Sequence, residues 1–259
     1  MDLQLQDKVI PVTGGAKGIG EGIAMVLAKE GAIPVIIGRK SADNQKVVQA
    51  IEAAGGKAWQ VQAELTDPAS SGAAVQAILR QFGRIDGLVN NAGVNDGVNL
   101  EHGSYEAFMA SIHKNLVHYY LMAHHALPAL KASKGAIVNI SSKTAETGQG
   151  GTSAYAASNG GRNALTREWA VELLPYGIRV NAIVVAECYT PLYENWIRSL
   201  PNPEEKLASI VQKIPLGHRM TTAEEIANTT AFLLSERSSH TTGQLIHVDG
   251  GYVHLDRSL

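Results

Sequence analysis

Short runs of apolar and β-branched residues alternate with longer amphipathic stretches along the whole chain. The short runs predict strands at residues 9–12, 33–37, 58–62, 87–90, 136–140, 179–184 and 244–248. The longer stretches predict helices at residues 19–30, 44–54, 68–82, 104–130, 154–174 and 223–234. Strands that alternate with helices build right-handed βαβ units. The pattern therefore predicts an α/β fold, a single doubly wound domain over residues 1–259 with a seven-stranded parallel sheet flanked by helices on both faces.

Residues 191–220 interrupt this alternation between the sixth strand and the next helix. The segment contains Trp196 and the prolines Pro201, Pro203 and Pro215. Ligands of open parallel sheets bind outside the carboxyl ends of the strands, so an insertion at that edge is predicted to be a substrate lid. The alternative is a surface loop that takes no part in substrate binding.

A glycine-rich loop, Thr13-Gly14-Gly15-Ala16-Lys17-Gly18-Ile19-Gly20, follows the first strand and opens the first helix. Glycines at 14, 18 and 20 permit a tight turn, a close approach of the backbone to a pyrophosphate and close packing of the helix on the sheet. The helix N-terminus adds unpaired N–H groups and the positive end of its dipole. The loop predicts a Rossmann domain that binds a dinucleotide through Gly14, Gly15, Lys17, Gly18, Ile19 and Gly20.

The residues after the second strand bear on the choice between NAD and NADP. An NAD site usually has an acidic residue at this strand end, where it binds the 2′-hydroxyl of the adenosine ribose. Here Gly38 takes that place, Arg39 and Lys40 follow, and Lys17 lies in the glycine-rich loop. Three cations without a carboxylate favour the 2′-phosphate of NADP. The alternative, that Arg39 and Lys40 are solvated surface charges, leaves NAD open.

Composition and charge exclude several functional classes. The chain has 22 basic and 24 acidic residues and a formal charge of −2, so no basic surface is expected to hold nucleic acid. The nine histidines and the single cysteine, Cys188, lack the spacing of metal ligands, and no metal site is predicted. The N-terminus lacks the features of a secretory signal, and no apolar run reaches the roughly 18 residues of a membrane span. We expect a cytoplasmic protein with no membrane partner.

Several polar motifs occur in a fixed order after the predicted strands. Asn90-Asn91-Ala92-Gly93 ends the fourth strand, Ser142 follows the fifth, and Tyr155 opens a helix thirteen residues later. With the glycine-rich loop, Asn115, Arg179-Val180-Asn181 and Val248-Asp249-Gly250-Gly251, these motifs resemble the short-chain dehydrogenase/reductase family over essentially the full chain. The stretches 91–97, 141–145, 166–171 and 249–257 and the pair Ala186-Glu187 are similar to its bacterial L-fucose dehydrogenase group, although Val185 stands where that group has proline.

The resemblance implies how these residues are used. Tyr155 would take the hydroxyl proton while hydride leaves for the nicotinamide. Ser142 would hold the reacting oxygen near Tyr155, and Asn115 would anchor a water in a proton relay. Besides the glycine-rich loop, the implied cofactor contacts are Arg39, Lys40, Glu64, Leu65, Asn91, Ala92, Gly93, Tyr155, Asn159, Val185 and Thr190.

One member of the predicted catalytic set departs from the family. Four residues after Tyr155, on the same helix face, the family has a lysine that binds the nicotinamide ribose and lowers the pKa of the tyrosine; here stands Asn159. The Asn159 amide can keep the first role but cannot supply charge. A free tyrosine with a pKa near 10 is only about one part in a thousand ionised at pH 7. Three interpretations are open: the cationic nicotinamide suffices, Lys143 supplies the charge, or the protein binds cofactor with little catalysis.

Polar residues at the rim of the strand ends indicate the substrate class. Trp196 on the predicted lid can stack on an apolar sugar face. We expect an NAD(P)-dependent dehydrogenase that oxidises a pyranose such as L-fucose at C1 to a lactone; a carbonyl reductase for another small polar substrate and a catalytically impaired NAD(P)-binding protein are the alternatives. The resemblance implies a homotetramer. The predicted substrate site consists of Asn95, Ser142, Lys143, Gln149, Tyr155, Glu187 and Trp196.

Overall fold

A seven-stranded parallel sheet forms the centre of the molecule. The computed structural model describes residues 1–255; Asp256 and Arg257, the end of one stretch that carries the family resemblance, lie outside the described residues. The strands follow the order β3-β2-β1-β4-β5-β6-β7, and all neighbouring strands run parallel. This topology confirms the predicted doubly wound sheet. The strands are β1 (Val9–Thr13), β2 (Ile33–Gly38), β3 (Trp59–Gln62), β4 (Gly87–Asn90), β5 (Ala136–Ser142), β6 (Arg179–Val185) and β7 (Leu245–Val248).

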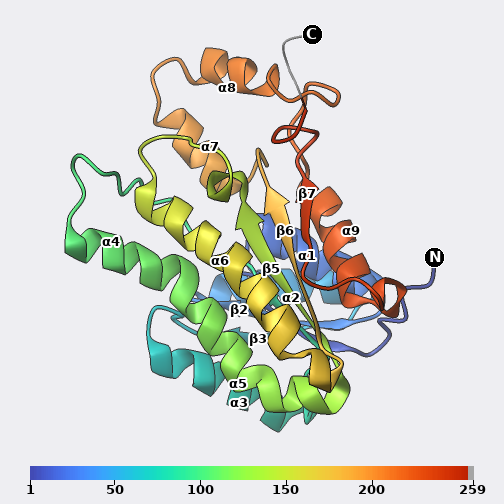
Figure 1. Cartoon of the computed structure of the whole chain (residues 1–259). Helices are drawn as coiled ribbons and strands as arrows, with labels where there is room; N and C mark the ends of the chain where they lie inside the picture. The colour runs from blue at the N-terminus through green and yellow to red at the C-terminus, as the bar shows by residue number, and fades with distance from the viewer. Residues whose placement is uncertain (256–259) are drawn as a thin grey trace.

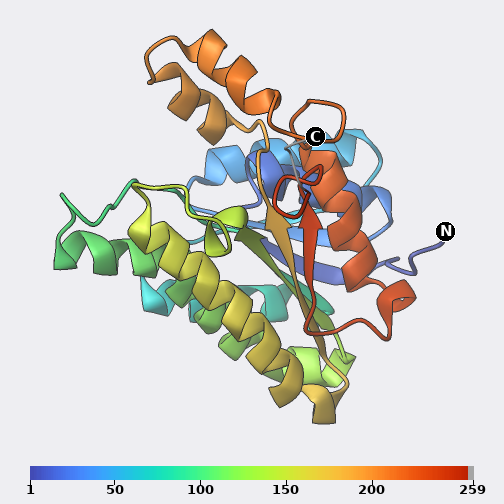
Figure 2. The ribbon, with the colours of Figure 1, turned by 45° about the horizontal axis from the view of Figure 1, so that its top comes forward.

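Helices cover both faces of the sheet because successive strand residues point to opposite sides. Val9 packs in the core shared with α3 (Pro68–Phe82), α5 (His118–Ser133) and α6 (Ser153–Glu172). The next residue, Ile10, packs in the core shared with α1 (Gly18–Lys29) and α9 (Ala223–Leu234). The two helical layers stand on either side of the strands in Figures 1 and 2. The helix α2 (Ser41–Ala53) packs beside α1. Three short helical turns complete the described part of the chain: η2 (Lys143–Ala145), η3 (Leu174–Tyr176) and η4 (Glu236–Ser238).

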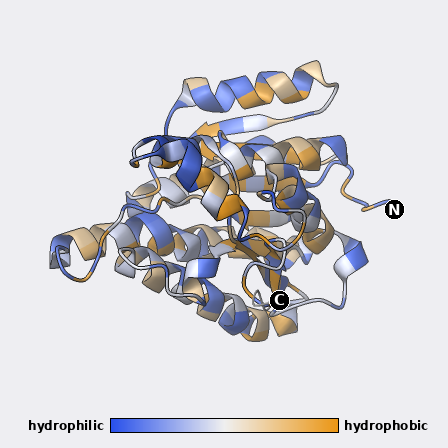
Figure 3. Cartoon of the chain, turned by 90° about the horizontal axis from the view of Figure 1, so that it is seen from above, coloured by the Kyte–Doolittle hydropathy of each residue, from blue (hydrophilic) through white to orange (hydrophobic). Residues whose placement is uncertain are grey.

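Buried strands explain the continuous apolar runs in the sequence. All five residues of β1 and all four of β4 are buried, and Figure 3 shows hydrophobic residues gathered in the central strands, while the surrounding helices alternate in character. Since β1 lies between β2 and β4, the chain order reverses there, and a parallel sheet of this kind binds its ligand at the carboxyl edge beside that reversal.

The segment predicted as one helix over residues 104–130 has a π-helical turn in its middle. It divides into α4 (Tyr105–Ile112), the π-helical turn η1 (His113–Val117) and α5, which extends to Ser133. The predicted helix is therefore present, but its π-helical turn was not predicted. A π-helical turn accommodates an extra residue, changes the direction of the carbonyls within it and is frequent at functional sites. Asn115 lies in this turn and is fully buried.

Residues 191–220 form two helices, α7 (Pro191–Arg198) and α8 (Pro203–Val211), and a connection to α9. Both helices lie beyond the carboxyl ends of the strands, at the top of Figure 1. Thr190 caps α7 by accepting a hydrogen bond from Tyr193 N at 3.2 Å. The segment thus has the position expected of a lid, while its movement stays a prediction. Among residues 1–255, no helix combines the length and apolar character needed to cross a bilayer.

Candidate active site

The glycine-rich loop forms a compact turn between β1 and α1. Gly14 and Gly18 have φ angles of 64° and 58°, the left-handed region that favours glycine. A Cβ on Gly20 would lie 2.6 Å from Asn91 Nδ2, so a side chain there would push the loop away from β4. The N-terminus of α1 has no side-chain cap, and its first amides are suited to hold phosphate oxygens. This cradle fits the pyrophosphate of a dinucleotide.

Hydrogen bonds join the loop after β1 to the loop after β4. The Thr13 hydroxyl accepts the N–H groups of Asn91 at 2.8 Å and Ala92 at 3.1 Å, and Asn91 Nδ2 donates to Thr13 O at 2.9 Å. On the other side of the turn, a Cβ on Gly18 would lie 3.1 Å from Thr190 Cγ2. The structure therefore brings together predicted cofactor residues from three separate segments.

The charges near the end of β2 correct one interpretation of the sequence. Asp43 in the first turn of α2 pairs with Lys17 at 2.9 Å, and this contact lowers the pKa of the Asp43 carboxyl. Glu64 lies 3.8 Å from Arg39. The inference that no carboxylate accompanies the three cations was wrong, because α2 and the loop after β3 each supply one. Lys40 is the member of the three with no ion pair among residues 1–255.

Asn44 explains why glycine occupies position 38. The Asn44 side chain is fully buried and donates to the carbonyls of Gly38 at 3.1 Å and Val61 at 3.2 Å. A Cβ on Gly38 would collide with Asn44 Oδ1. An acidic side chain, which would recognise the ribose 2′-hydroxyl from this position, is excluded by packing.

Ser142 and Tyr155 stand on neighbouring elements at the carboxyl edge. Ser142 ends β5 and caps η2, where its hydroxyl accepts from Thr144 N at 3.3 Å. Tyr155 lies in the first turn of α6, which packs against η2 and β5. Both side chains are partly exposed, as groups that meet a substrate must be. The reaction of this pair stays a prediction.

Asn115 and Asn159 are fully buried, and their amides are bonded within the protein. Asn115 Oδ1 accepts from Val94 N at 2.7 Å, and its Nδ2 donates to Ser111 O at 3.0 Å. Asn159 Nδ2 donates to Tyr155 O at 2.8 Å, one turn earlier on α6. Asn159 Oδ1 accepts from Arg162 Nη1 at 2.9 Å. Asn159 therefore lies between the main chain of Tyr155 and a buried guanidinium, a contact that sequence reasoning did not foresee.

Arg162 is a residue that the sequence analysis missed. Its side chain is 3% exposed and lies on the face of α6 that also carries Tyr155 and Asn159. The guanidinium carbon is 6.0 Å from the ring centroid of Tyr155 and 4.3 Å from that of Tyr119. The spacing of seven residues from Tyr155 was the available signal, since residues i, i+4 and i+7 share a helix face.

The predicted substrate residues Lys143 and Glu187 form a buried ion pair. The Lys143 ammonium also lies 4.0 Å from the ring centroid of Tyr252. Burial and the neighbouring Glu187 raise the pKa of Tyr193, whose ring packs at 5.1 Å on Trp196. Tyr193 and Tyr252 were missed by the sequence analysis.

The remaining predicted site residues differ in exposure. Trp196 is 42% exposed and comes from α7, the predicted lid. Asn95 and Gln149 are exposed, and Asn95 makes a local turn contact with Gly97 N at 3.3 Å. Leu65, in the loop after β3, and Val185, the last residue of β6, are buried.

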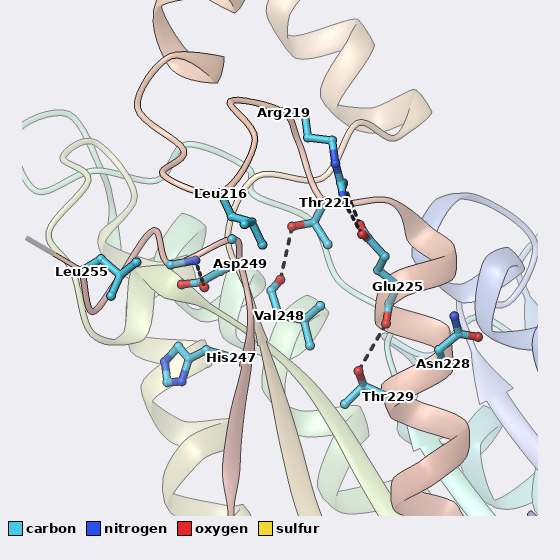
Figure 4. A pocket seen from close by; sticks show the side chains of 12 residues that line it. Leu216, Arg219, Thr221, Glu225, Asn228, Thr229, His247, Val248, Asp249 and Leu255 are labelled. Atoms are coloured by element: carbon cyan, nitrogen blue, oxygen red, sulfur yellow. Dashed lines mark hydrogen bonds and ion pairs between the residues drawn. The ribbon is translucent and has the colours of Figure 1, made fainter. Parts of the chain in front are cut away.

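A cavity of about 530 Å³ lies between α9 and the segment after β7 (Figure 4). Thr221 donates across it to Val248 O at 3.4 Å, and Arg219 pairs with Glu225 at its rim. None of the predicted catalytic, cofactor or substrate residues lines it. The volume of a cavity alone does not locate the active site here, because the glycine-rich loop, Ser142 and Tyr155 are not part of this lining.

Three potential metal ligands also come together from distant segments. Ligand atoms of Glu146, His247 and His254 lie within 4.8 Å of one another. Their separation in sequence explains why a search for ligand spacing did not find them. His247 Nε2 and Glu146 Oε2 are 2.9 Å apart, which is a hydrogen-bond distance, and the expectation of no metal stays a prediction.

Comparison with known proteins agrees with this geometry. The profile of the family described as enoyl-(acyl carrier protein) reductase matches residues 14–253. The chain is 36% identical over 253 residues to a 3-oxoacyl-[acyl-carrier-protein] reductase of Thermotoga maritima, covering 97% of this chain and 100% of that protein.

A second relative and a solved structure extend the likeness. The chain is 33% identical to an L-fucose dehydrogenase of Bos taurus, covering 97% and 91% of the two chains. It superposes on the crystal structure of the Cj0485 dehydrogenase with a TM-score of 0.94 and 46% identity, covering 100% and 99%. The chain is an oxidoreductase that belongs to the short-chain dehydrogenase/reductase family.

Proposed function

We propose that this enzyme oxidises a pyranose sugar, L-fucose or a close relative, at C1 with NAD(P)⁺ and releases a lactone. The observation that carries the proposal is the buried Lys143–Glu187 pair, bordered by the rings of Tyr252 and Tyr193. Sugars are recognised by charged hydrogen-bond partners combined with aromatic faces. A purely apolar substrate such as an acyl chain would offer this ion pair no hydrogen bonds.

Each residue has a defined task in this proposal. A nicotinamide bound at the phosphate cradle would supply the acceptor for the hydride of C1. Tyr155 takes the proton of the anomeric hydroxyl as the C1–O bond becomes a carbonyl, and Ser142 donates a hydrogen bond to the same oxygen. The glycine-rich loop and the N-terminus of α1 hold the pyrophosphate. Lys143 and Glu187 orient the remaining sugar hydroxyls.

We also propose that NADP is the preferred nucleotide. Lys17, Arg39 and Lys40 surround the end of β2, and Asn44 excludes an acidic residue at position 38. Asp43 and Glu64 offset two of the three charges, so the preference should be modest, and NAD should also support the reaction.

The test is a panel of substrates assayed through the absorbance of NAD(P)H. L-fucose and related pyranoses should reduce the nucleotide, whereas cyclohexanol and a hydroxyacyl thioester should not. Glu187→Gln should raise KM for the sugar at least tenfold with a smaller effect on nucleotide affinity. The proposal fails if apolar alcohols are the better substrates, which would favour a different carbonyl reductase. Tight nucleotide binding with no turnover of any substrate would instead favour an impaired binding protein.

The lid, the assembly and the location complete the proposal. Residues 191–220 would close over the sugar and place Trp196 on its apolar face. A homotetramer and a cytoplasmic location follow from the family resemblance. Light scattering of the purified enzyme tests the assembly directly.

A further inference from the structure

Arg162 is a buried cation with neutral partners. Its Nε donates to Asn115 O at 2.7 Å, and its Nη1 donates to Ile140 O at 3.1 Å and to Asn159 Oδ1 at 2.9 Å. Arg162 forms no ion pair with a carboxylate in the described part of the chain. Its Nη2 is buried without a hydrogen-bond partner.

A charge in such surroundings is unfavourable for folding. Removal of an ion from water is costly, and neutral acceptors offset this cost less completely than a carboxylate does. Arginine keeps its proton in proteins, so the positive charge persists at any pH at which the enzyme works. Uncompensated buried charges concentrate at functional sites, where their field acts on a neighbouring group.

Local structure fixes the direction of the guanidinium. The π-helical turn η1 presents the carbonyl of Asn115 to α6, where Arg162 Nε binds it. Gly93 also lies against the guanidinium, because a Cβ there would lie 2.8 Å from Arg162 Nη2. Gly93 belongs to the motif after β4 that is expected to line the cofactor. The guanidinium thus fills a space made by two of the predicted site segments.

We propose that Arg162 is a positioning residue that supplies the positive charge missing at Asn159 and thereby favours the phenolate form of Tyr155. The guanidinium acts through space, with its carbon 6.0 Å from the centroid of the Tyr155 ring. Asn159 holds it in this place, because its Oδ1 accepts from Arg162 and its Nδ2 donates to the main-chain carbonyl of Tyr155. This inference rests on the proposed role of Tyr155 as the base. A unit charge at about 6 Å in a partly buried site is expected to shift an ionisation by about one to two pH units.

Other titratable groups around Arg162 do not replace its charge. Burial, followed by the charge of Arg162, lowers the pKa of His118 to about 4, so its ring is neutral in the assay range. Burial raises the pKa of Tyr119, which stays a phenol. Lys143 on η2 is paired with Glu187, and Glu64 lies 3.8 Å from Arg39. Arg162 is therefore the net charge that faces Tyr155.

The experiment compares Arg162→Met, Arg162→Gln and Arg162→Lys with Arg167→Met, an exposed arginine on the same helix. With the sugar as substrate, the two neutral variants should lose tenfold to a hundredfold in kcat at pH 7 (about 1.4 to 2.7 kcal/mol) and approach the wild type above pH 10. Arg162→Lys should keep most of the activity. The double variant with Asn159→Lys and Arg162→Met should have a kcat at pH 7 at least tenfold above that of Arg162→Met alone.

A second measurement needs no turnover. The phenolate absorbance of each substrate-free variant, minus that of its Tyr155→Phe counterpart, reports ionisation at position 155. Its midpoint should rise by about one to two pH units in Arg162→Met and Arg162→Gln and stay fixed in Arg167→Met. Such a rise without sugar turnover would uphold the inference and reject the proposed function. An unmoved midpoint, with kcat lowered equally at every pH, would overturn the inference even if the sugar is oxidised.

Discussion

Lys143 and Arg162 are both buried beside the carboxyl end of β5, yet their surroundings differ in charge. Lys143 faces the Glu187 carboxylate and the Tyr252 ring. Arg162 faces two backbone carbonyls and the Asn159 amide oxygen. Because a close ion pair has no net charge, its field decays quickly with distance, whereas a lone cation acts on every ionisable group nearby.

In the proposed function, these two surroundings serve different tasks. The Lys143–Glu187 pair offers directional hydrogen bonds at the rim, where a polyol can exchange contacts with both partners. Arg162 offers charge from within the protein and has no exposed surface for a ligand. In that function, substrate recognition depends on Lys143 and Glu187, and activation of Tyr155 depends on Arg162.

The largest effect is expected when one member of the ion pair is removed. Lys143→Met leaves Glu187 charged, buried and unpaired, which should lower the free energy of unfolding by about 3 to 5 kcal/mol. Lys143→Met combined with Glu187→Leu should restore much of that loss. Urea denaturation measures both, and Lys114→Met, at the exposed pair with Asp96, should cost less than about 1 kcal/mol. Equal losses in the single and double variants would show that the pair has no such coupling.

A second effect follows from His118, which lies beside Arg162. Its pKa of about 4 in the folded protein is below the value near 6.5 of an unfolded histidine. The unfolded chain therefore binds the proton first as the pH falls, and stability should decline by about 3 kcal/mol between pH 6.5 and pH 4. Below pH 4 both states bind the proton, so this residue should cause no further loss.

Matched variants isolate this contribution. His118→Gln should flatten the pH dependence of the free energy of unfolding over that interval, whereas His113→Gln, an exposed histidine on the preceding turn, should not. The assignment is contradicted if both variants keep the full acid loss, since another group would then bind the proton.

The fold was predictable to a large extent because buried positions are apolar and recur along the sequence in the pattern of each helix or strand. Every predicted strand overlaps an observed one, and the switch between β1 and β4 follows from the alternation with helices. The π-helical turn at Asn115 was not predictable in this way. One extra residue in a turn changes the positions of its carbonyls but hardly disturbs an apolar pattern of three to four residues.

In the site, too, local features were predictable and contacts between distant residues were not. The glycine-rich loop, Ser142 and Tyr155 are local motifs, and the sequence places them correctly at one edge of the sheet. Partners distant in sequence could not be foreseen: Glu187 comes 44 residues after Lys143, and Asp43 reaches Lys17 from the next helix. Arg162 lay on a predictable helix face, but its neutral surroundings come from β5 and η1, which no local pattern reveals.

The cofactor end of the molecule should respond to a single surface charge. Arg39→Asp places a carboxylate where Arg39 now partly offsets Glu64, and should change the ratio of the NADP and NAD dissociation constants by about tenfold toward NAD. Lys57→Asp, an exposed change near Asp7 at the opposite edge of the sheet, should leave the ratio unchanged. Calorimetric titration at one ionic strength measures both constants. A tenfold preference of the wild type for NAD would contradict the proposed role of the cations.

The smallest effect is expected from restoring lysine at position 159. If Arg162 is left out of account, Asn159→Lys is expected to raise kcat at pH 7 by about tenfold to a hundredfold, because it adds a positive charge near Tyr155. The proposed role of Arg162 predicts a smaller gain. The ammonium introduced by Asn159→Lys would lie beside the Arg162 guanidinium, and repulsion between the two would offset much of its effect on Tyr155. Asn159→Lys should therefore change kcat at pH 7 less than tenfold, while the same change in the Arg162→Met background should have the larger effect. The pH–rate profiles of the four proteins form a double-mutant cycle, and additive effects at the two positions would mean that Arg162 and residue 159 act on Tyr155 independently.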